Sequence, residues 1–149
     1  MTHDFPILVA EDNPEDAELL KLALRRVGFH DRIIFVPDGQ AAVDYLEGRG
    51  EYADRYHYPF PQVLISDLKM PRVNGFELLE WLRKDEQCCV IPAILLSGSG
   101  LAQDVKAAYK LGANTYFQKP SSFFDLVELL TRLKEYWTRS ELPAAVGKR

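Results

Sequence analysis

The sequence contains only two cysteines and three histidines among 149 residues, which limits the metal and redox chemistry it can support. Cys88 and Cys89 are adjacent, so they cannot build a disulfide framework or a zinc site by themselves. We interpret them as packing residues at the end of a helix. The histidines His3, His30 and His57 are scattered, and we interpret them as surface residues. The sequence therefore shows no Ser-His-Asp or Cys-His arrangement of the kind that hydrolases use.

Long apolar runs and dense runs of basic residues are also missing. No stretch approaches the ~20 apolar residues of a membrane helix, and the first residues lack the order typical of a signal peptide. Acidic residues outnumber basic ones by 22 to 18, for a net charge of −4, which disfavours binding to nucleic acid or to an anionic membrane. We therefore expect a cytoplasmic protein that contacts neither.

What the sequence does contain is a regular alternation of short apolar strands and amphipathic helices. A chain of this length, 47% hydrophobic, suits one domain with a single sizeable core. The predicted strands are Pro6–Ala10, Arg32–Val36, Val63–Ser66, Ala93–Ser97 and Thr115–Gln118. The predicted helices lie near residues 14–27, 39–46, 76–85, 102–111 and 123–138. This alternation predicts an α/β fold, a doubly wound five-stranded parallel sheet in the flavodoxin-like order 2-1-3-4-5 with helices on both faces.

Acidic residues follow two of the strands that this order places side by side. Glu11 and Asp12 follow the first strand, and Asp67 follows the third, so all three should meet at the carboxyl edge of the sheet. Converging carboxylates repel unless one is protonated or a cation lies between them. Because carboxylate oxygens suit a hard cation, the sequence predicts a Mg²⁺ site at this edge.

The same edge receives a hydroxyl and an ammonium group from the last two strands. Ser97 ends the fourth strand, and Lys119 follows the fifth. These are the groups expected to hold the oxygens of a phosphoryl group. Asp67 is then the natural nucleophile, because a carboxylate can form an aspartyl phosphate.

Taken together, Glu11-Asp12, Asp67, Ser97 and Lys119-Pro120, with Met70-Pro71 and Gly75 between them, resemble the receiver domain of two-component response regulators from about Phe5 to Trp137. The resemblance implies that Asp67 accepts a phosphoryl group from a sensor histidine kinase. It also implies that Asp12 binds Mg²⁺ directly, Glu11 through water, and Lys69 through its backbone carbonyl. Ser97 and Tyr116 would form a switch, and Lys119 would pair with the phosphoryl group across a cis Lys119–Pro120 bond.

More narrowly, the 47–61 loop and the segments Ala108–Tyr116 and Glu135–Trp137 resemble the stand-alone receivers that partner phytochromes. On this basis we assign residues 5–139 to a receiver domain and 140–149 to a tail with no output domain. The resemblance implies a self-phosphorylating and autodephosphorylating protein, with no separate substrate, that signals to an unknown downstream protein by direct contact.

Three alternatives share parts of this pattern. A flavodoxin has the same fold, but its FMN phosphate needs a Ser/Thr/Gly-rich loop where this chain has Glu11–Asp16. A phosphatase of the haloacid dehalogenase type expects a second Asp two residues after the first, where this chain has Lys69. A degenerate receiver would serve only as an interaction module, although here every site position is filled.

Two segments permit more than one interpretation. The loop from Glu47 to Pro61 is rich in Gly, Tyr and Pro, and it either forms a partner surface or packs against its own domain. The last helix has an apolar side wider than the ~100° stripe that docks on a sheet. That side comprises Phe123, Leu126, Val127, Leu129, Leu130, Leu133, Tyr136 and Trp137. It predicts a homodimer interface, unless Tyr136 and Trp137 fold back to seal the sheet edge of a monomer.

Overall fold

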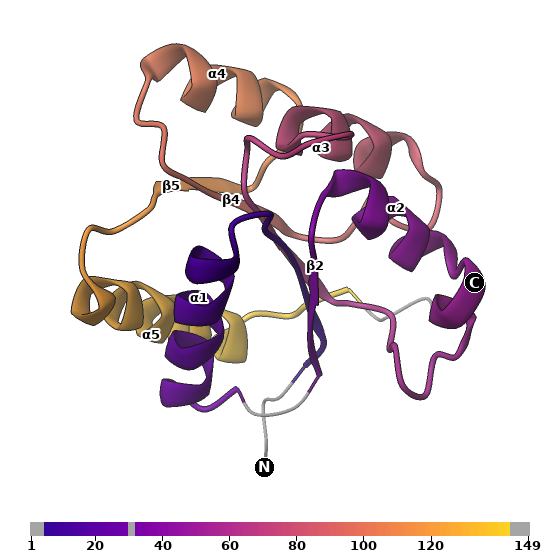
Figure 1. Ribbon diagram of the computed structural model, residues 1–149, viewed down its shortest axis with the longest axis horizontal. Coiled ribbons are helices and arrows are strands. Elements are labelled where there is room, and N and C mark those ends of the chain that lie inside the picture. Colours follow the sequence, from indigo (N-terminus) through magenta and orange to yellow (C-terminus); the bar gives the residue numbers. More distant parts are fainter. Residues whose placement is uncertain (1–4, 30–31, 144–149) are drawn as a thin grey trace.

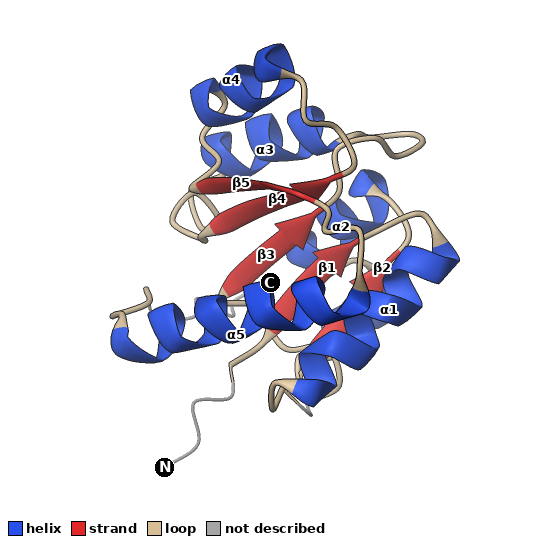
Figure 2. Ribbon diagram, turned by 90° about the vertical axis from the view of Figure 1, so that its left-hand side faces the viewer, coloured by secondary structure: helices blue, strands red, loops and turns tan. Residues whose placement is uncertain are grey.

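The fold is built on one parallel sheet, which a computed structural model describes for residues 5–29 and 32–143. Its strands are β1 (Ile7–Ala10), β2 (Ile33–Val36), β3 (Val63–Ser66), β4 (Ala93–Ser97) and β5 (Thr115–Gln118). They lie in the order β2-β1-β3-β4-β5, all parallel, as Figure 2 shows. Every residue of β1, β3 and β4 is buried, because the central strands are covered on both faces. The predicted fold class and strand order are confirmed.

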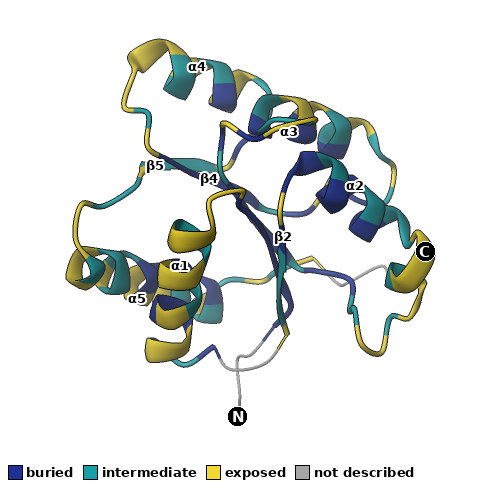
Figure 3. Cartoon of the chain, in the orientation of Figure 1, coloured by how far each residue is buried: buried dark blue, intermediate teal, exposed yellow. Residues whose placement is uncertain are grey.

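Helices cover the two faces of the sheet unequally (Figure 1). α1 (Pro14–Arg26) and α5 (Phe123–Arg139) pack on one face, and α2 (Gly39–Glu47), α3 (Gly75–Lys84) and α4 (Ala102–Lys110) pack on the other. Alternate residues of β1 separate the two cores, with Ile7 and Val9 facing α1 and α5 while Leu8 faces α2 and α3. Figure 3 shows the central strands of the sheet buried and much of α1 exposed.

The helices near the carboxyl edge of the sheet begin at side chains that cap them. Asn13 accepts a hydrogen bond from the backbone N–H of Asp16 at the start of α1, and Asp38 accepts one from Ala41 at the start of α2. Asn74 and Glu77 form a reciprocal capping box at the start of α3. These caps fix where each strand-to-helix loop ends, and therefore how the loops hold the site.

The loop between α2 and β3 packs mainly against its own domain. It contains a short 3-10 helix, η1 (Gly50–Ala53), and the rings of Tyr52 and Tyr58 contact the buried ring of Tyr45. The guanidinium of Arg55 lies 5.5 Å from the centre of the Tyr45 ring. Among the three tyrosines and Phe60 of the loop, only Tyr56 is exposed, at 90%. The interpretation as a self-packed loop therefore holds for most of the segment.

Other sequence predictions fall partly outside the described residues. Cys88, in the turn after α3, is buried in the core, and neither cysteine forms a disulfide. His3, His30 and residues 144–149 of the predicted tail are outside the described part. Within it, Leu142 packs against the α1–α5 core, and the side-chain amide of Gln62 donates to the Pro143 carbonyl. None of the described helices is both long and apolar enough to span a membrane.

Candidate functional site

Three carboxylates meet where β1 and β3 end. The backbone N–H of Asp67 donates to the carbonyl of Ala10 over 2.9 Å, which brings the residues after the two strands together. One carboxylate oxygen from each of Glu11, Asp12 and Asp67 lies within 4.8 Å of the others. Glu11 is buried, Asp67 is half-buried and Asp12 is exposed. The structure thus brings together the three acidic residues that the sequence predicted.

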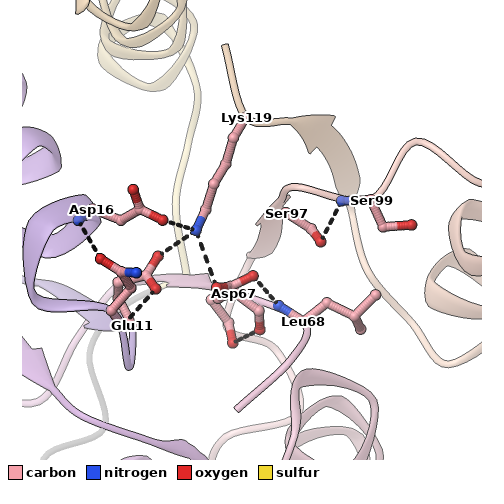
Figure 4. A network of polar contacts seen from close by, with 9 residues as sticks. Glu11, Asp16, Asp67, Leu68, Ser97, Ser99 and Lys119 are labelled. Carbon is pink, nitrogen blue, oxygen red and sulfur yellow. Dashed lines mark hydrogen bonds and ion pairs between the residues drawn. The ribbon is translucent and has the colours of Figure 1, made fainter. Parts of the chain in front are cut away.

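The ammonium of Lys119 lies among these carboxylates (Figure 4). Its Nζ is 2.9 Å from Glu11 Oε1 and 3.1 Å from Asp67 Oδ2. A third carboxylate, Asp16 on the first turn of α1, is closer still, at 2.7 Å. Sequence reasoning missed this third partner, because it did not assign Asp16 to the site. The sequence feature that could have placed Asp16 near the site is its position in the loop-to-helix segment that also carries Glu11 and Asp12.

The pKa values of Glu11 and Lys119 are both raised, which favours the neutral form of the carboxyl and the charged form of the ammonium. Burial raises the pKa of Glu11 to about 7, although the Lys119 ammonium and the backbone N–H of Asn13 oppose the shift. Burial by itself would lower the pKa of Lys119, but its bonds to Asp16 and Glu11 and the charge of Asp67 outweigh that effect and raise it. Lys119 is therefore a permanent cation, while Glu11 needs further positive charge to ionise fully.

The acidic cluster has the chemistry of a site for a hard divalent metal ion. Its oxygens come from short loops at the rim of a cleft of about 580 Å³, which Asp12, Asp67, Lys69, Ser97 and Lys119 help to line. Oxygen donors with an exposed member leave room for water in the coordination sphere, as Mg²⁺ and similar ions require. The residues present therefore fit a bound divalent cation.

Ser97 and Tyr116 are connected through the loop between β4 and α4. The Ser97 hydroxyl is buried and accepts a hydrogen bond from the backbone N–H of Ser99 over 3.1 Å. The Tyr116 hydroxyl donates to the carbonyl of Ser99 over 2.8 Å. The Ser99 hydroxyl in turn donates to the Asp104 carboxylate over 2.6 Å. Ser99, which the sequence did not assign to the site, therefore joins the two predicted switch residues to α4.

The prediction of a cis Lys119–Pro120 bond is wrong, because no peptide bond in the described residues is cis. With the trans bond, the backbone N–H of Lys119 donates to the Ser97 carbonyl over 2.7 Å. The Lys119 side chain still reaches the Asp67 carboxylate from this position. The trans form is also the more stable one for most X–Pro bonds.

Residues 7–131 match the family described as the response regulator receiver domain. The chain belongs to this family. This receiver is 38% identical to the probable methanogenesis regulatory protein FilR2 of Methanothrix harundinacea, over 94% of this chain and 90% of that protein. It is 31% identical to the response regulator Rcp1 of Synechocystis, over 93% of each chain. The flavodoxin and phosphatase interpretations are therefore set aside.

Solved structures agree with this membership. The receiver superposes on the response regulator RPA3017 in red light signalling of R. palustris with a TM-score of 0.88, 35% identity and coverage of 94% of this chain and 99% of that one. The phosphorylated cyanobacterial phytochrome response regulator RcpA gives a TM-score of 0.85, 30% identity and coverage of 95% and 99%. The Mn²⁺-bound form of Rcp1 gives a TM-score of 0.83 and 30% identity, with coverage of 94% of this chain and 99% of that one.

Proposed function

We propose that this receiver accepts a phosphoryl group on Asp67 from the phosphohistidine of a sensor histidine kinase. The observation that carries the proposal is the position of the Lys119 ammonium, 3.1 Å from Asp67 Oδ2, beside a carboxylate cluster suited to a divalent cation. A carboxylate nucleophile and a fixed cation in one open cleft are what phosphoryl transfer requires. The crystallised phosphorylated state of RcpA supports the same role here.

In the transfer, a carboxylate oxygen of Asp67 attacks phosphorus, so that a P–O bond forms and the P–N bond of phosphohistidine breaks. The electron pair returns to the imidazole nitrogen of the kinase. Lys119 pairs with a phosphoryl oxygen as negative charge gathers there, and the backbone N–H of Leu68, which donates to Asp67 Oδ1 over 2.6 Å, helps orient the carboxylate. Hydrolysis of the same P–O bond by water returns the receiver to its starting state.

We further propose that the divalent cation is Mg²⁺, held by Asp12, Asp67 and the backbone carbonyl of Lys69, with Glu11 acting through water. When bound, Mg²⁺ supplies positive charge that neutralises the phosphoryl oxygens during transfer. The existence of a Mn²⁺-bound form of the similar response regulator Rcp1 supports a divalent ion in this receiver. The carboxylates of this receiver contribute oxygen donors alone, which is the preference of Mg²⁺.

Phosphorylation would be read out through Ser97 and Tyr116. In this structure the Ser97 hydroxyl accepts a hydrogen bond from the backbone N–H of Ser99. We propose that on phosphorylation the hydroxyl gives up this bond and turns toward a phosphoryl oxygen. Because the Tyr116 hydroxyl donates a hydrogen bond to the Ser99 carbonyl, a movement of Ser99 is passed on to β5 and α4. The receiver then signals by direct contact with a downstream protein in the cytoplasm.

Receiver domains of this type have a sensor kinase as partner, and we propose that the kinase is phytochrome-like. The similarity to RcpA, a phytochrome response regulator, and to RPA3017 in red light signalling supports this choice. A test is phosphotransfer from purified phosphorylated kinases, one phytochrome-type and one not. Faster transfer from a kinase without a phytochrome sensor would contradict the assignment.

We also propose that α5 forms a homodimer interface. Trp137 is buried against Phe5, with ring centres 5.6 Å apart, so it seals the core of its own chain. Tyr136, by contrast, is 68% exposed. Together with Leu129 and with Phe117 of the edge strand, Tyr136 lines a groove of about 650 Å³. A second copy covering this groove would bury the excess apolar side of the helix.

The central proposal is tested by phosphorylation of purified protein with Mg²⁺ and acetyl phosphate, followed by intact-mass measurement. Wild type should gain the mass of one phosphoryl group, and Asp67→Asn should not. Glu15→Gln, which removes an exposed carboxylate from the first turn of α1, should label like wild type. Wild-type labelling of Asp67→Asn would place the acceptor elsewhere. A wild type that takes no label from acetyl phosphate or from phosphorylated kinase would favour the pure interaction module.

A further inference from the structure

The ammonium of Lys119 has no spare hydrogen-bond donor in this structure. A lysine ammonium has three N–H groups. Here three carboxylates surround Nζ, from Asp16 at 2.7 Å, Glu11 at 2.9 Å and Asp67 at 3.1 Å, and Figure 4 shows them on different sides of the nitrogen. A phosphoryl oxygen can therefore pair with Lys119 only if one of these contacts lengthens or breaks.

Asp16 differs from Glu11 and Asp67 because it is not part of the carboxylate cluster suited to a metal ion. Glu11 and Asp67 belong to the cluster suited to a metal ion, whereas Asp16 does not. Its backbone is held at the start of α1, where its N–H donates to the side chain of Asn13 over 3.0 Å. Its carboxylate is 40% exposed and lines the cleft that also holds Asp67. Of the three partners, it alone binds Lys119 without belonging to that cluster.

We propose that Asp16 is a positioning residue that competes with the phosphoryl group for the Lys119 ammonium and so limits how stable the phosphorylated state is. The inference rests on the proposed function of Asp67 and Lys119. Once a phosphoryl group is on Asp67, its oxygens take the place of Asp67 Oδ2 as acceptors on the Lys119 side. Asp16 then holds the ammonium on the α1 side of the cleft, and its negative charge also repels the anionic group.

Removing the Asp16 carboxylate should stabilise the phosphorylated state for two reasons. Removing the Asp16 charge frees one N–H of Lys119 and lowers the negative charge near the phosphoryl oxygens. Both changes favour the phosphorylated state. A general loosening of the site would have the opposite effect, because the phosphoryl group needs precisely placed partners. A gain in affinity therefore separates competition from a merely structural role.

The experiment measures the binding of beryllium trifluoride, a phosphoryl analogue, at saturating Mg²⁺ by the ¹⁹F resonances of the bound form. Asp16→Asn should bind the analogue about fivefold more tightly than wild type, the factor expected for a partly exposed ion pair. Glu15→Gln removes an equal charge from the adjacent exposed position and should bind like wild type. Asp16→Glu keeps the carboxylate and should return affinity to within about twofold of wild type.

The outcomes distinguish this inference from the proposed function. If wild type binds no analogue and takes no phosphoryl group on Asp67, the proposed function itself fails. If wild type binds but Asp16→Asn binds equally or more weakly, only the competition fails. If Glu15→Gln gains as much affinity as Asp16→Asn, the effect is one of overall charge, and the role assigned to Asp16 is wrong.

Discussion

The guanidinium of Arg72 binds the Asp38 carboxylate through two nitrogens, with Nε and Nη2 each donating over 3.0 Å. Asp38 is buried at the start of α2, while Arg72 lies in the loop that follows Asp67 and has a left-handed backbone, with φ of 65°. The backbone N–H of Gly39 also donates to the Val73 carbonyl over 3.0 Å. This pair of contacts fastens the loop after β3 to α2.

Arg72→Ala should lower the free energy of unfolding by about 1–3 kcal/mol, because a buried carboxylate loses its charged partner. The side chain of Arg72 is 58% exposed, which places the expected loss toward the lower end. Denaturant unfolding measures it. Arg72→Lys keeps the charge but not the two-pronged geometry, and should fall between Ala and wild type. Equal stability of all three proteins would show that the pair does not hold the loop.

Gly75, the first residue of α3, lies too close to the backbone of Asp67, the proposed phosphoacceptor, to carry a side chain. A Cβ at this position would lie 2.4 Å from the Asp67 carbonyl oxygen and 2.9 Å from the Leu68 Cα. Gly75→Ala should therefore cost about 1–3 kcal/mol of stability, as overpacking does, and slow labelling by acetyl phosphate. Gly98→Ala is the control, because a Cβ there meets nothing within 4 Å although Gly98 lines the same cleft. Equal labelling rates for the two variants would contradict this account.

The raised pKa of Glu11 predicts that metal binding depends on pH. Burial raises that pKa from 4.5 to about 7, so between these values the metal-free folded state holds a proton that the unfolded state has lost. The contribution of Glu11 to stability therefore falls as pH rises through this window. A divalent cation favours the ionised carboxylate, so metal affinity should rise with pH until about 7 and then level off.

Calorimetric titration with Mg²⁺ at several pH values checks this expectation, and buffers of different ionisation enthalpy report the proton released. Glu11→Gln should remove the proton release in that window, because the amide cannot titrate. Metal affinity that is the same at pH 5 and pH 7 in wild type would show that Glu11 is already ionised without the ion.

The sequence predicted the strand order and the convergence of Glu11, Asp12, Asp67 and Lys119, because apolar strands that end in polar residues reveal a shared sheet edge. It did not predict that Asp16 binds Lys119, since these residues are 103 positions apart and Asp16 has an ordinary role as a first-turn acid. The Arg72–Asp38 pair, 34 positions apart, was missed for the same reason. Only the folded chain shows which of several charged side chains meet.

The prolyl bond shows a different limit. Its cis state was inferred from resemblance alone, and no physical feature of Lys119-Pro120 in the sequence selects an isomer. The last helix shows a third limit, since its apolar side could be traced but not divided between core and surface. The structure divides it, with Leu130, Leu133 and Trp137 in the core and Tyr136 outside.

The proposed dimer makes the exposed Tyr136 a sensitive position. Tyr136→Asp would place a charge in the groove that a second copy covers, and burying an unpaired charge is costly. Analytical ultracentrifugation at tens of micromolar should show a dimer for wild type and a monomer for this variant, with an unchanged circular dichroism spectrum.

Phe124→Asp is the matched control for this experiment, because Phe124 lies on the same helix and is 74% exposed but does not line the groove. It should leave the dimer intact. The same comparison after phosphorylation with acetyl phosphate shows whether the phosphoryl group strengthens association. A wild type that sediments as a monomer in both states would refute the dimer. A dimer that is lost in Phe124→Asp but not in Tyr136→Asp would place the interface at the first turn of α5.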